Sequence, residues 1–343
     1  MAKNLLAFLA VVIFLFSFRE ARKVLFPKPS HFPKPEYNFK NNPLDSNATK
    51  LGRYLFFDPV LSKDSSISCA SCHSPFNAFA HSDHSLSHGI NDTIGRRNAP
   101  ALFNLAWQNL FMWDGAINHL DVQALAPLSS SAEMGESLNH VIQKINKQTF
   151  YKKAFKAAFD SEEVSGERFL KALSQFQLTL ISANSKYDRV RLGKEQFTEK
   201  EKKGYLLFSQ NCGSCHSEPL FSSYEFESNF LPVNAFLNDN GRAEVTLDRR
   251  DSMKFKVPSL RNLSFSFPYM HDGRFTKLNE VLNHYTDSTV QVQFLEAINK
   301  RPIYLSGDEK VDLIAFLLTL NDKEFVFNPK HRFPKELLTK TKE

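Results

Sequence analysis

All four cysteines of the chain lie in two copies of one pentapeptide, Cys69-Ala-Ser-Cys72-His73 and Cys212-Gly-Ser-Cys215-His216. In a C-x-x-C-H sequence, two thiols bond to the vinyl groups of one porphyrin and the adjacent histidine binds its iron. A four-cysteine zinc site needs its two C-x-x-C pairs about 15–20 residues apart, and the two pairs here are much farther apart. A redox dithiol would need neither the histidine nor a second copy. The pattern therefore predicts two covalently bound haem c groups.

Length, motifs and charge restrict the number of domains and the classes of ligand that we expect. A chain of 343 residues is expected to form about two domains, which fits one domain per haem motif. The sequence contains no G-x-G-x-x-G segment, so a dinucleotide-binding loop is excluded. The net charge of +6 is mild and spread along the chain, so we expect no nucleic-acid partner.

The N-terminal segment predicts export. An apolar run from Leu5 to Phe18 follows Lys3 and precedes basic residues. It fits a signal peptide and is short for a membrane-spanning helix, so residues 1–23 are expected to be a cleaved signal peptide or an uncleaved N-terminal anchor. Because haem c is attached outside the cytoplasmic membrane, we predict a periplasmic protein, with membrane anchoring as the alternative. Residues 24–44 are proline-rich and are predicted to form an extended tether.

Apolar residues recur with helical spacing in several segments, two of which lead directly into the haem motifs. The predicted helical segments are 50–57, 138–159, 167–182, 201–208 and 311–320. Strand signals are scarce, so the expected fold is mostly α. We expect an N-terminal haem domain over residues 45–195 and a C-terminal haem domain over residues 196–335.

A second repeat follows the haem motifs. Residues 100–115 align without gaps to residues 258–273, with Pro, Leu, Asn, Leu, Met, Asp and Gly in register. Such self-similarity indicates two copies of one haem-binding unit, that is, two cytochrome c-like domains. The copies differ at one informative position, where Trp113 in the first corresponds to His271 in the second.

The sixth ligand of each iron decides the chemistry, because a six-coordinate haem transfers electrons whereas an open position can bind a small oxidant. Near the first haem, whose proximal ligand is His73, the candidates are His81, His84 and His88. Gln123 and Glu133 follow in sequence, and a carboxylate above an open iron could move the proton that cleavage of an O–O bond requires. The alternative for Glu133 is a solvated residue at a helix start.

Near the second haem, whose proximal ligand is His216, four residues are candidates for the sixth position. They are Met270, His271, His284 and Tyr285. Met270 is discounted because Met112 occupies the same place in the first copy, which indicates a packing role.

The chain resembles the bacterial dihaem cytochrome c peroxidase/MauG family over residues 45 to 330. The matching segments occur in the family's order: the two C-x-x-C-H motifs, Arg97-Asn98-Ala-Pro100, Met112-Trp113-Asp-Gly115, Gln123-Ala, Glu133-Met134, Val257-Pro-Ser-Leu-Arg-Asn262 and Pro268-Tyr-Met-His-Asp-Gly273.

The resemblance implies roles for particular residues. The first haem would be the peroxidatic one, with Glu133 as the acid–base residue, Gln123 beside it and His88 as a removable distal ligand. Trp113 would relay electrons between the haems. A calcium ion would lie at the domain boundary, near Asn98, Ser266 and Pro268.

One position departs from the peroxidase pattern. Where peroxidases of this family have a methionine as sixth ligand of the second haem, this chain has Tyr285, as the MauG branch does. A phenolate stabilises ferric iron and lowers its potential. His88 favours the peroxidases, and Tyr285 favours MauG.

The predicted function is therefore that of an exported dihaem peroxidase. It would reduce H2O2 to water with electrons that enter through the second haem from a small donor cytochrome. The alternatives are a MauG-like oxidase of a protein or organic substrate, and a dihaem electron carrier without enzymatic activity. A homodimer is also possible.

Overall fold

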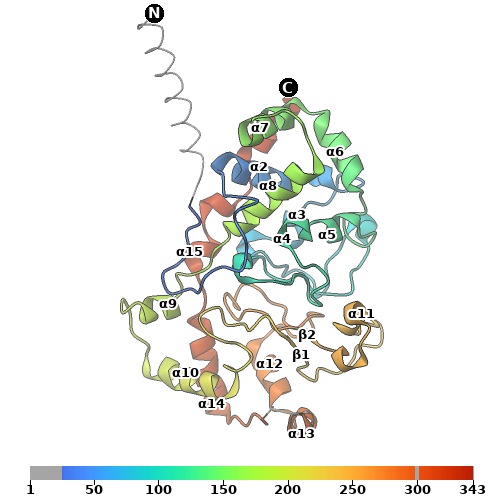
Figure 1. Ribbon diagram of the computed structural model, residues 1–343. Helices are drawn as coiled ribbons and strands as arrows, with labels where there is room; N and C mark the ends of the chain where they lie inside the picture. Colours follow the sequence, from blue (N-terminus) through green and yellow to red (C-terminus); the bar gives the residue numbers. More distant parts are fainter. Residues whose placement is uncertain (1–24, 298–300, 343) are drawn as a thin grey trace, which may run out of the picture.

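The computed structural model describes residues 25–297 and 301–342 (Figure 1). The predicted signal peptide or anchor, residues 1–23, lies outside this part of the chain. Within the described residues, no helix is both long enough and apolar enough to cross a membrane.

The fold is mostly helical, as predicted, with one two-stranded antiparallel sheet that pairs β1 (Phe226–Glu227) with β2 (Phe255–Lys256). Short 3₁₀ turns, the last at Lys335–Lys342, join many of the helices. The α-helices are α2 (Ser46–Phe57), α3 (Cys69–Cys72), α4 (Leu120–Gln123), α5 (Leu125–Ser129), α6 (Leu138–Asn146), α7 (Thr149–Phe159), α8 (Gly166–Leu178), α9 (Lys186–Arg191), α10 (Glu199–Asn211), α11 (Ala243–Thr246), α12 (Leu278–Tyr285), α13 (Ser288–Glu296), α14 (Gly307–Leu318) and α15 (Lys323–Val326).

Three predicted helical segments have different bounds in the structure, and the one predicted over residues 311–320 ends at Leu318. Residues 138–159 form α6 and α7 rather than one helix, because Gln148 has extended backbone angles (φ −102°, ψ 118°) within a short polar segment that gives no apolar face to continue. The helix predicted over residues 167–182 ends at Leu178. There the hydroxyl of Thr179 donates to the carbonyl of Phe176, which ends the helical hydrogen-bonding pattern.

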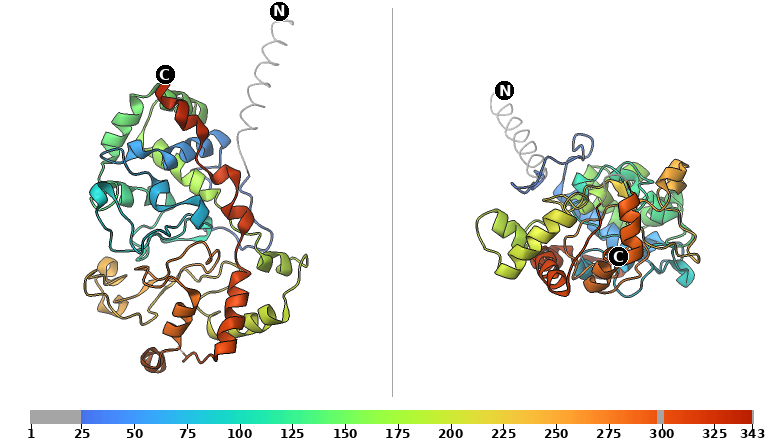
Figure 2. Two further views of the ribbon diagram at one scale, coloured as in Figure 1. Left: turned by 180° about the vertical axis from the view of Figure 1, so that it is seen from behind. Right: turned by 90° about the horizontal axis from the view of Figure 1, so that it is seen from below.

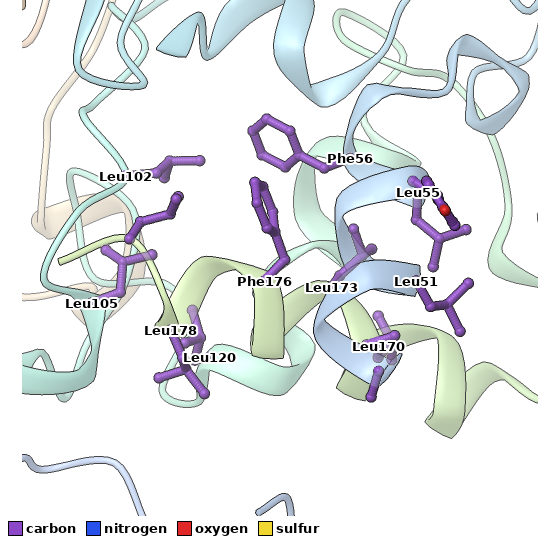
Figure 3. Packing of buried hydrophobic residues seen from close by; sticks show 14 of the residues in the cluster. Leu51, Leu55, Phe56, Leu102, Leu105, Leu120, Leu170, Leu173, Phe176 and Leu178 are labelled. Carbon is purple, nitrogen blue, oxygen red and sulfur yellow. The ribbon is translucent and has the colours of Figure 1, made fainter. Parts of the chain in front are cut away.

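The first half of the molecule is built on the crossing of α2 and α8. Phe56 of α2 and Phe176 of α8 are both buried, with ring centroids 5.2 Å apart, and leucines of both helices extend the contact (Figure 3). The helices approach closely at Gly52, where a Cβ atom would lie 1.8 Å from the carbonyl oxygen of Ala172. Only glycine allows this approach.

The second half repeats this crossing with α10 and α14. A Cβ atom at Gly204 would lie 1.9 Å from the carbonyl oxygen of Asp312, and Phe208 packs against Phe316 with ring centroids 5.1 Å apart. Gly52 and Gly204 each precede a C-x-x-C-H motif. The two motifs are thus introduced by the same helix-on-helix contact.

Residues 25–44 form no helix or strand, but they are packed rather than free, unlike the expected tether. Phe32 is buried and meets Trp107 edge-to-face, with ring centroids 5.0 Å apart. The indole N–H of Trp107 donates to the carbonyl of Pro33 (3.0 Å), and His31 Nε2 lies 2.8 Å from Asp188. Aromatic residues between the prolines explain the difference, because their burial outweighs the cost of ordering the segment.

The C-terminal segment returns to the first half (Figure 2). Phe325 packs against Phe79 and Phe103, with ring centroids 5.9 and 5.8 Å apart, and Val326 and Leu337 join the same core. These residues lie at the end of the chain, beyond α14, where the sequence was expected to complete the second domain or to follow it. The first hydrophobic core is therefore assembled from both ends of the described chain.

Candidate functional site

The first haem motif forms the one-turn helix α3, which places Cys69 and Cys72 one turn apart on the same side. The backbone N–H of His73 donates to the carbonyl of Cys69 (2.9 Å), and its ring Nδ1 donates to the carbonyl of Phe79 (2.8 Å). Since a carbonyl only accepts, Nδ1 carries the proton and Nε2 keeps its lone pair. Burial lowers the pKa of His73 to about 4, so the ring is neutral and able to bind a metal.

The second motif has the same geometry at the end of α10. His216 donates its backbone N–H to the carbonyl of Cys212 (2.9 Å), and its Nδ1 lies 3.2 Å from the carbonyl of Phe221 and 3.1 Å from that of Pro258. Burial again lowers the histidine pKa to about 4. Both carbonyls that orient Nδ1 from just beyond a motif, those of Phe79 and Phe221, belong to residues with positive φ (59° and 55°).

Both sites therefore fit a haem c. All four cysteines, each within the described residues, are free thiols. Burial raises the pKa of Cys69 and Cys212 to about 12, so they behave as apolar thiols suited to thioether bonds rather than as thiolate metal ligands. In each motif, two thiols and one neutral imidazole with an available Nε2 form the donor set that haem c attachment requires.

The fold places Glu133 near the first motif. It lies in a half-buried turn after α5, and the carbonyl of Glu133 accepts from the N–H of Ile90 (2.8 Å). Burial raises the pKa of its carboxyl group, which a hydrogen bond from Ser130 partly opposes. Burial also raises the pKa of Cys72 to about 11, and the charge of Glu133 adds to the rise, so the carboxyl group lies near this thiol. Glu133 is thus neither exposed nor at a helix start.

Gln123, at the end of α4, contacts Met112. Its side-chain amide lies 3.6 Å from the sulfur of Met112, and in the second half the amide of Asn229 lies 3.3 Å from the sulfur of Met270. The two methionines have the same left-handed backbone conformation (φ 68° and 73°). This equivalence agrees with a packing role for Met270.

The three loop histidines after the first motif form a stack. The rings of His81 and His84 have centroids 5.6 Å apart, and those of His84 and His88 are 4.4 Å apart. Nδ1 of His88 lies 2.6 Å from the carboxylate of Asp92, and the carbonyl of His88 lies 3.8 Å from the sulfur of Cys72. The loop thus runs beside the first motif, where His88 contacts Cys72 and His81 interacts with the backbone of Ser71.

At the second motif, Tyr285 and His284 both interact with Asn229, but only Tyr285 has the cysteines among the groups that shift its pKa. His284 Nε2 donates to the carbonyl of Asn229 (2.9 Å). Burial raises the pKa of Tyr285 to about 12, a hydrogen bond from Asn229 opposes the rise, and the nearby thiols of Cys212 and Cys215 add to it. The phenol of Tyr285, at the end of α12, is therefore the group that lies near both cysteines.

Trp113 lies where the two halves meet. Its indole N–H donates to the carbonyl of Asn98 (2.8 Å), and the N–H of Asn98 donates to the carbonyl of His271 (2.7 Å). Trp113 and His271, which occupy equivalent positions of the two repeats, are thus linked through one residue, Asn98. The ring of His271 stacks on Phe255, with centroids 3.7 Å apart.

An arginine that sequence analysis did not single out joins the halves beside Trp113. Arg97 binds Asp114 of the first half (2.5 Å) and donates two hydrogen bonds to Asp239 of the second (2.6 and 2.7 Å). Arg97 and Asp114 lie in segments that the resemblance highlighted. Asp239 lies in a segment without a motif, so no sequence signal pointed to the pairing.

The residues predicted to bind calcium make other contacts. Asn98 donates its side-chain amide to the carbonyl of Ser85 (3.0 Å), and the hydroxyl of Ser266 donates to the carbonyl of Asn262 (3.3 Å). Across the described chain, no group of three or more histidine, cysteine, aspartate or glutamate residues is arranged to hold a metal ion. Calcium at Asn98, Ser266 and Pro268 would depend on carbonyl and amide oxygens, and it stays a prediction.

Comparison with known proteins identifies MauG proteins and cytochrome c peroxidases as relatives of this chain. The family described as di-haem cytochrome c peroxidase matches residues 46–196. The methylamine utilization protein MauG of Methylorubrum extorquens is 36% identical over 88% of this chain and 84% of its own length. Cytochrome c551 peroxidase of Nitrosomonas europaea is 33% identical over 81% of each chain. A crystal structure described as a MauG-like protein associated with microbial copper homeostasis superposes with a TM-score of 0.81, at 29% identity, over 91% of this chain and 99% of that one.

Proposed function

The chain belongs to the dihaem cytochrome c peroxidase/MauG family, and from this membership we propose that it is a periplasmic dihaem peroxidase that reduces H2O2 to water. The relatives are named as peroxidases or as MauG proteins, and an oxidoreductase activity is common to both groups. The observation that carries the peroxidase proposal is Glu133, a half-buried carboxyl group with a raised pKa near Cys72 of the first motif.

Each haem c would be held by one motif. Cys69 and Cys72 would form thioethers and His73 would bind iron at the first site, and the equivalent residues would do so at the second. When bound, haem supplies the iron that takes up peroxide and passes electrons. We propose that the two crossings, α2 on α8 and α10 on α14, mark two related haem domains, and that the residues after α14 complete the first of them.

Glu133 would hold and move the proton in peroxide reduction. A carboxyl group whose pKa is raised by burial is protonated over a wider pH range, so it can donate to a departing oxygen and take the proton back from solvent. Gln123 lies at the end of α4 and would orient peroxide beside Glu133. His88, whose Nδ1 is fixed by Asp92, would be the removable ligand of the resting first site.

Trp113 would carry electrons between the two sites, since it lies where the halves meet. Electrons would come from a small donor cytochrome at the second site. Calcium at the boundary, membrane anchoring and a homodimer remain part of the proposal through the family resemblance alone.

A MauG-like oxidase is the second candidate, and Tyr285 favours it. The phenol lies near Cys212 and Cys215, whereas His284 is bound to the carbonyl of Asn229. A tyrosine ligand would lower the potential of the second iron and make it a poor acceptor of electrons from a high-potential cytochrome.

Haem mass, turnover assays and spectra of the irons test these proposals. Mass spectrometry of the denatured protein should show two retained haem masses, and a zinc-bearing or single-haem protein would refute the dihaem assignment. Peroxide consumption with a reduced donor cytochrome should then be catalytic. Peroxide-driven oxidation of an added protein, without donor-dependent turnover, would favour the MauG-like candidate, and a low-spin spectrum of both irons in every redox state would indicate an electron carrier.

A further inference from the structure

A buried amine lies behind the segment that carries Trp113. Lys256, in β2, directs its ammonium group into the first half, where it donates to the side-chain oxygen of Gln108 (2.8 Å) and the carbonyl of Leu110 (2.9 Å). The amine also lies 5.8 Å from the centre of the Phe111 ring. None of these acceptors is a carboxylate, so the charge of the amine is solvated by neutral dipoles only.

The backbone of Lys256 holds the same segment from its other end. Its N–H donates to the carbonyl of Trp113 (2.7 Å). The side chain and the main chain of Lys256 therefore contact residues 108–113 at two points, and they hold the amine against the segment that carries Trp113.

The environment of the indole makes a neighbouring charge important. The N–H of Trp113 donates to the carbonyl of Asn98, which cannot accept a proton outright. When Trp113 gives up one electron, the proton stays on Nε1, and the oxidised side chain is a cation. A second positive charge nearby opposes its formation, and loss of that charge favours it.

We propose that Lys256 sets the charge beside Trp113 and thereby controls how readily Trp113 is oxidised. The inference rests on the proposed relay role of Trp113. One electron leaves Trp113 toward the first site and is replaced by one from the second site, so the side chain is restored and no proton is exchanged. A protonated Lys256 slows the first of these steps, and a neutral Lys256 permits it.

The charge of Lys256 changes near neutral pH. Burial lowers the pKa of its amine to about 7, and the charge of Asp114 partly opposes this effect. Around it, Arg97 pairs with both Asp114 and Asp239, and Arg242 donates to the carbonyl of Asp114. Burial lowers the pKa of His271, whose ring stacks on Phe255 of β2, so this histidine is neutral at neutral pH. Lys256 is thus the group of this cluster that titrates between pH 6 and 8.5.

The test uses the dihaem protein with Trp107→Phe as background, so that Trp113 is the remaining tryptophan. Trp113 is oxidised by a photogenerated oxidant of fixed potential, and the trapped tryptophan radical is quantified by EPR at pH 6 and pH 8.5. With Lys256 intact, we expect the ratio of oxidised to reduced Trp113 to rise about tenfold between these pH values, which corresponds to about 59 mV for one electron.

Two variants separate charge from packing. Lys256→Met should give the high ratio at both pH values, and Lys256→Arg, which stays charged, should give the low ratio at both. A wild-type pH profile in both variants would overturn the proposal, as would equal ratios in the two variants, because a purely structural grip would not distinguish them by charge.

Failure of the relay itself is measured separately. Trp113→Phe should slow electron transfer from the second haem to the first in a rapid-mixing experiment. If that rate is unchanged while the radical ratio still follows Lys256, the relay role is refuted and the control of Trp113 by Lys256 stands.

Discussion

At the scale of single residues, burial gives Glu133 and Tyr285 their special properties. Both carry polar groups that the surrounding protein desolvates, and both lie near the cysteines of a haem motif. Desolvation favours the uncharged form of each group. The consequences differ, because a protonated carboxyl group is a proton donor, whereas a phenol becomes a strong iron ligand only when a cation stabilises its anion.

Glu133→Gln tests the carboxyl group. Peroxide turnover should fall roughly 10²–10⁴-fold, the usual contribution of a general acid–base, while both haem spectra persist. A raised pKa means that the folded state binds the proton more tightly than the unfolded state. Wild type therefore loses stability relative to Glu133→Gln as pH rises through the pKa of Glu133. Steady-state kinetics and thermal unfolding at pH 4 and 7 measure the two effects.

Glu199→Gln is the matched control, because Glu199 lies at the exposed start of α10. Neither turnover nor the pH dependence of its unfolding should differ much from wild type. If Glu133→Gln behaves like this control, Glu133 has no catalytic role.

Tyr285→Phe tests the second iron. The variant should change the ferric spectrum and spin state of the second haem and leave peroxide binding at the first intact, because the phenyl ring keeps the packing and loses the oxygen. His284→Gln retains a donor for the carbonyl of Asn229 and should keep the wild-type spectrum. The opposite pattern, with the change in His284→Gln alone, would make His284 the ligand.

At the scale of elements, two glycines fix how the helices before the motifs cross their partners. Gly52→Ala and Gly204→Ala would each place a methyl group within 2 Å of a backbone carbonyl. The gain in helix propensity, about 1 kcal/mol, is outweighed by overpacking, which costs about 1–3 kcal/mol. We expect a lower free energy of unfolding in urea for both variants. Gly307→Ala, where the added methyl group meets nothing within 4 Å, should be neutral or stabilising, and equal effects at all three glycines would contradict the crossing.

The helices also show what the sequence could predict. Residues 50–57 and 201–208 are helical as expected, because their apolar spacing faces one partner helix, and the helix predicted over residues 311–320 ends two residues early, at Leu318. The break between α6 and α7 was missed, because apolar residues recur at helical spacing on both sides of the polar turn at Gln148 and the turn is too short to interrupt that pattern. β1 and β2 are two residues long and carry no alternating pattern, so no sequence rule detects them.

At the scale of the whole molecule, the site residues fall into two groups, those whose partners are close in sequence and those whose partners are distant. His73 and Phe79 lie within one short stretch of sequence, so the motif with its immediate surroundings was predictable. The grip of Lys256 on residues 108–113 and the pairing of Arg97 with Asp239 join distant segments. Nothing in a single sequence specifies such partners, because many arginines and lysines would serve equally well by composition.

Phe325→Ala tests whether the end of the chain completes the first core. Phe325 is 3% exposed, and its loss should lower the free energy of unfolding by about 3–5 kcal/mol. Leu338→Ala, at a residue 66% exposed, should change it by less than about 0.5 kcal/mol. Denaturant unfolding followed by the absorbance of each haem gives the measurement. A loss confined to the second haem's transition would contradict the packing.

The return of the chain to Phe79 has a consequence for how the protein is made. A polypeptide that crosses a membrane N-terminus first presents Cys69 and Cys72 long before Phe325 follows. Until then, the aromatic cluster around Phe79 lacks the ring of Phe325. In a chain exported in this order, we expect haem attachment at the first motif to precede the packing of Phe325 against Phe79.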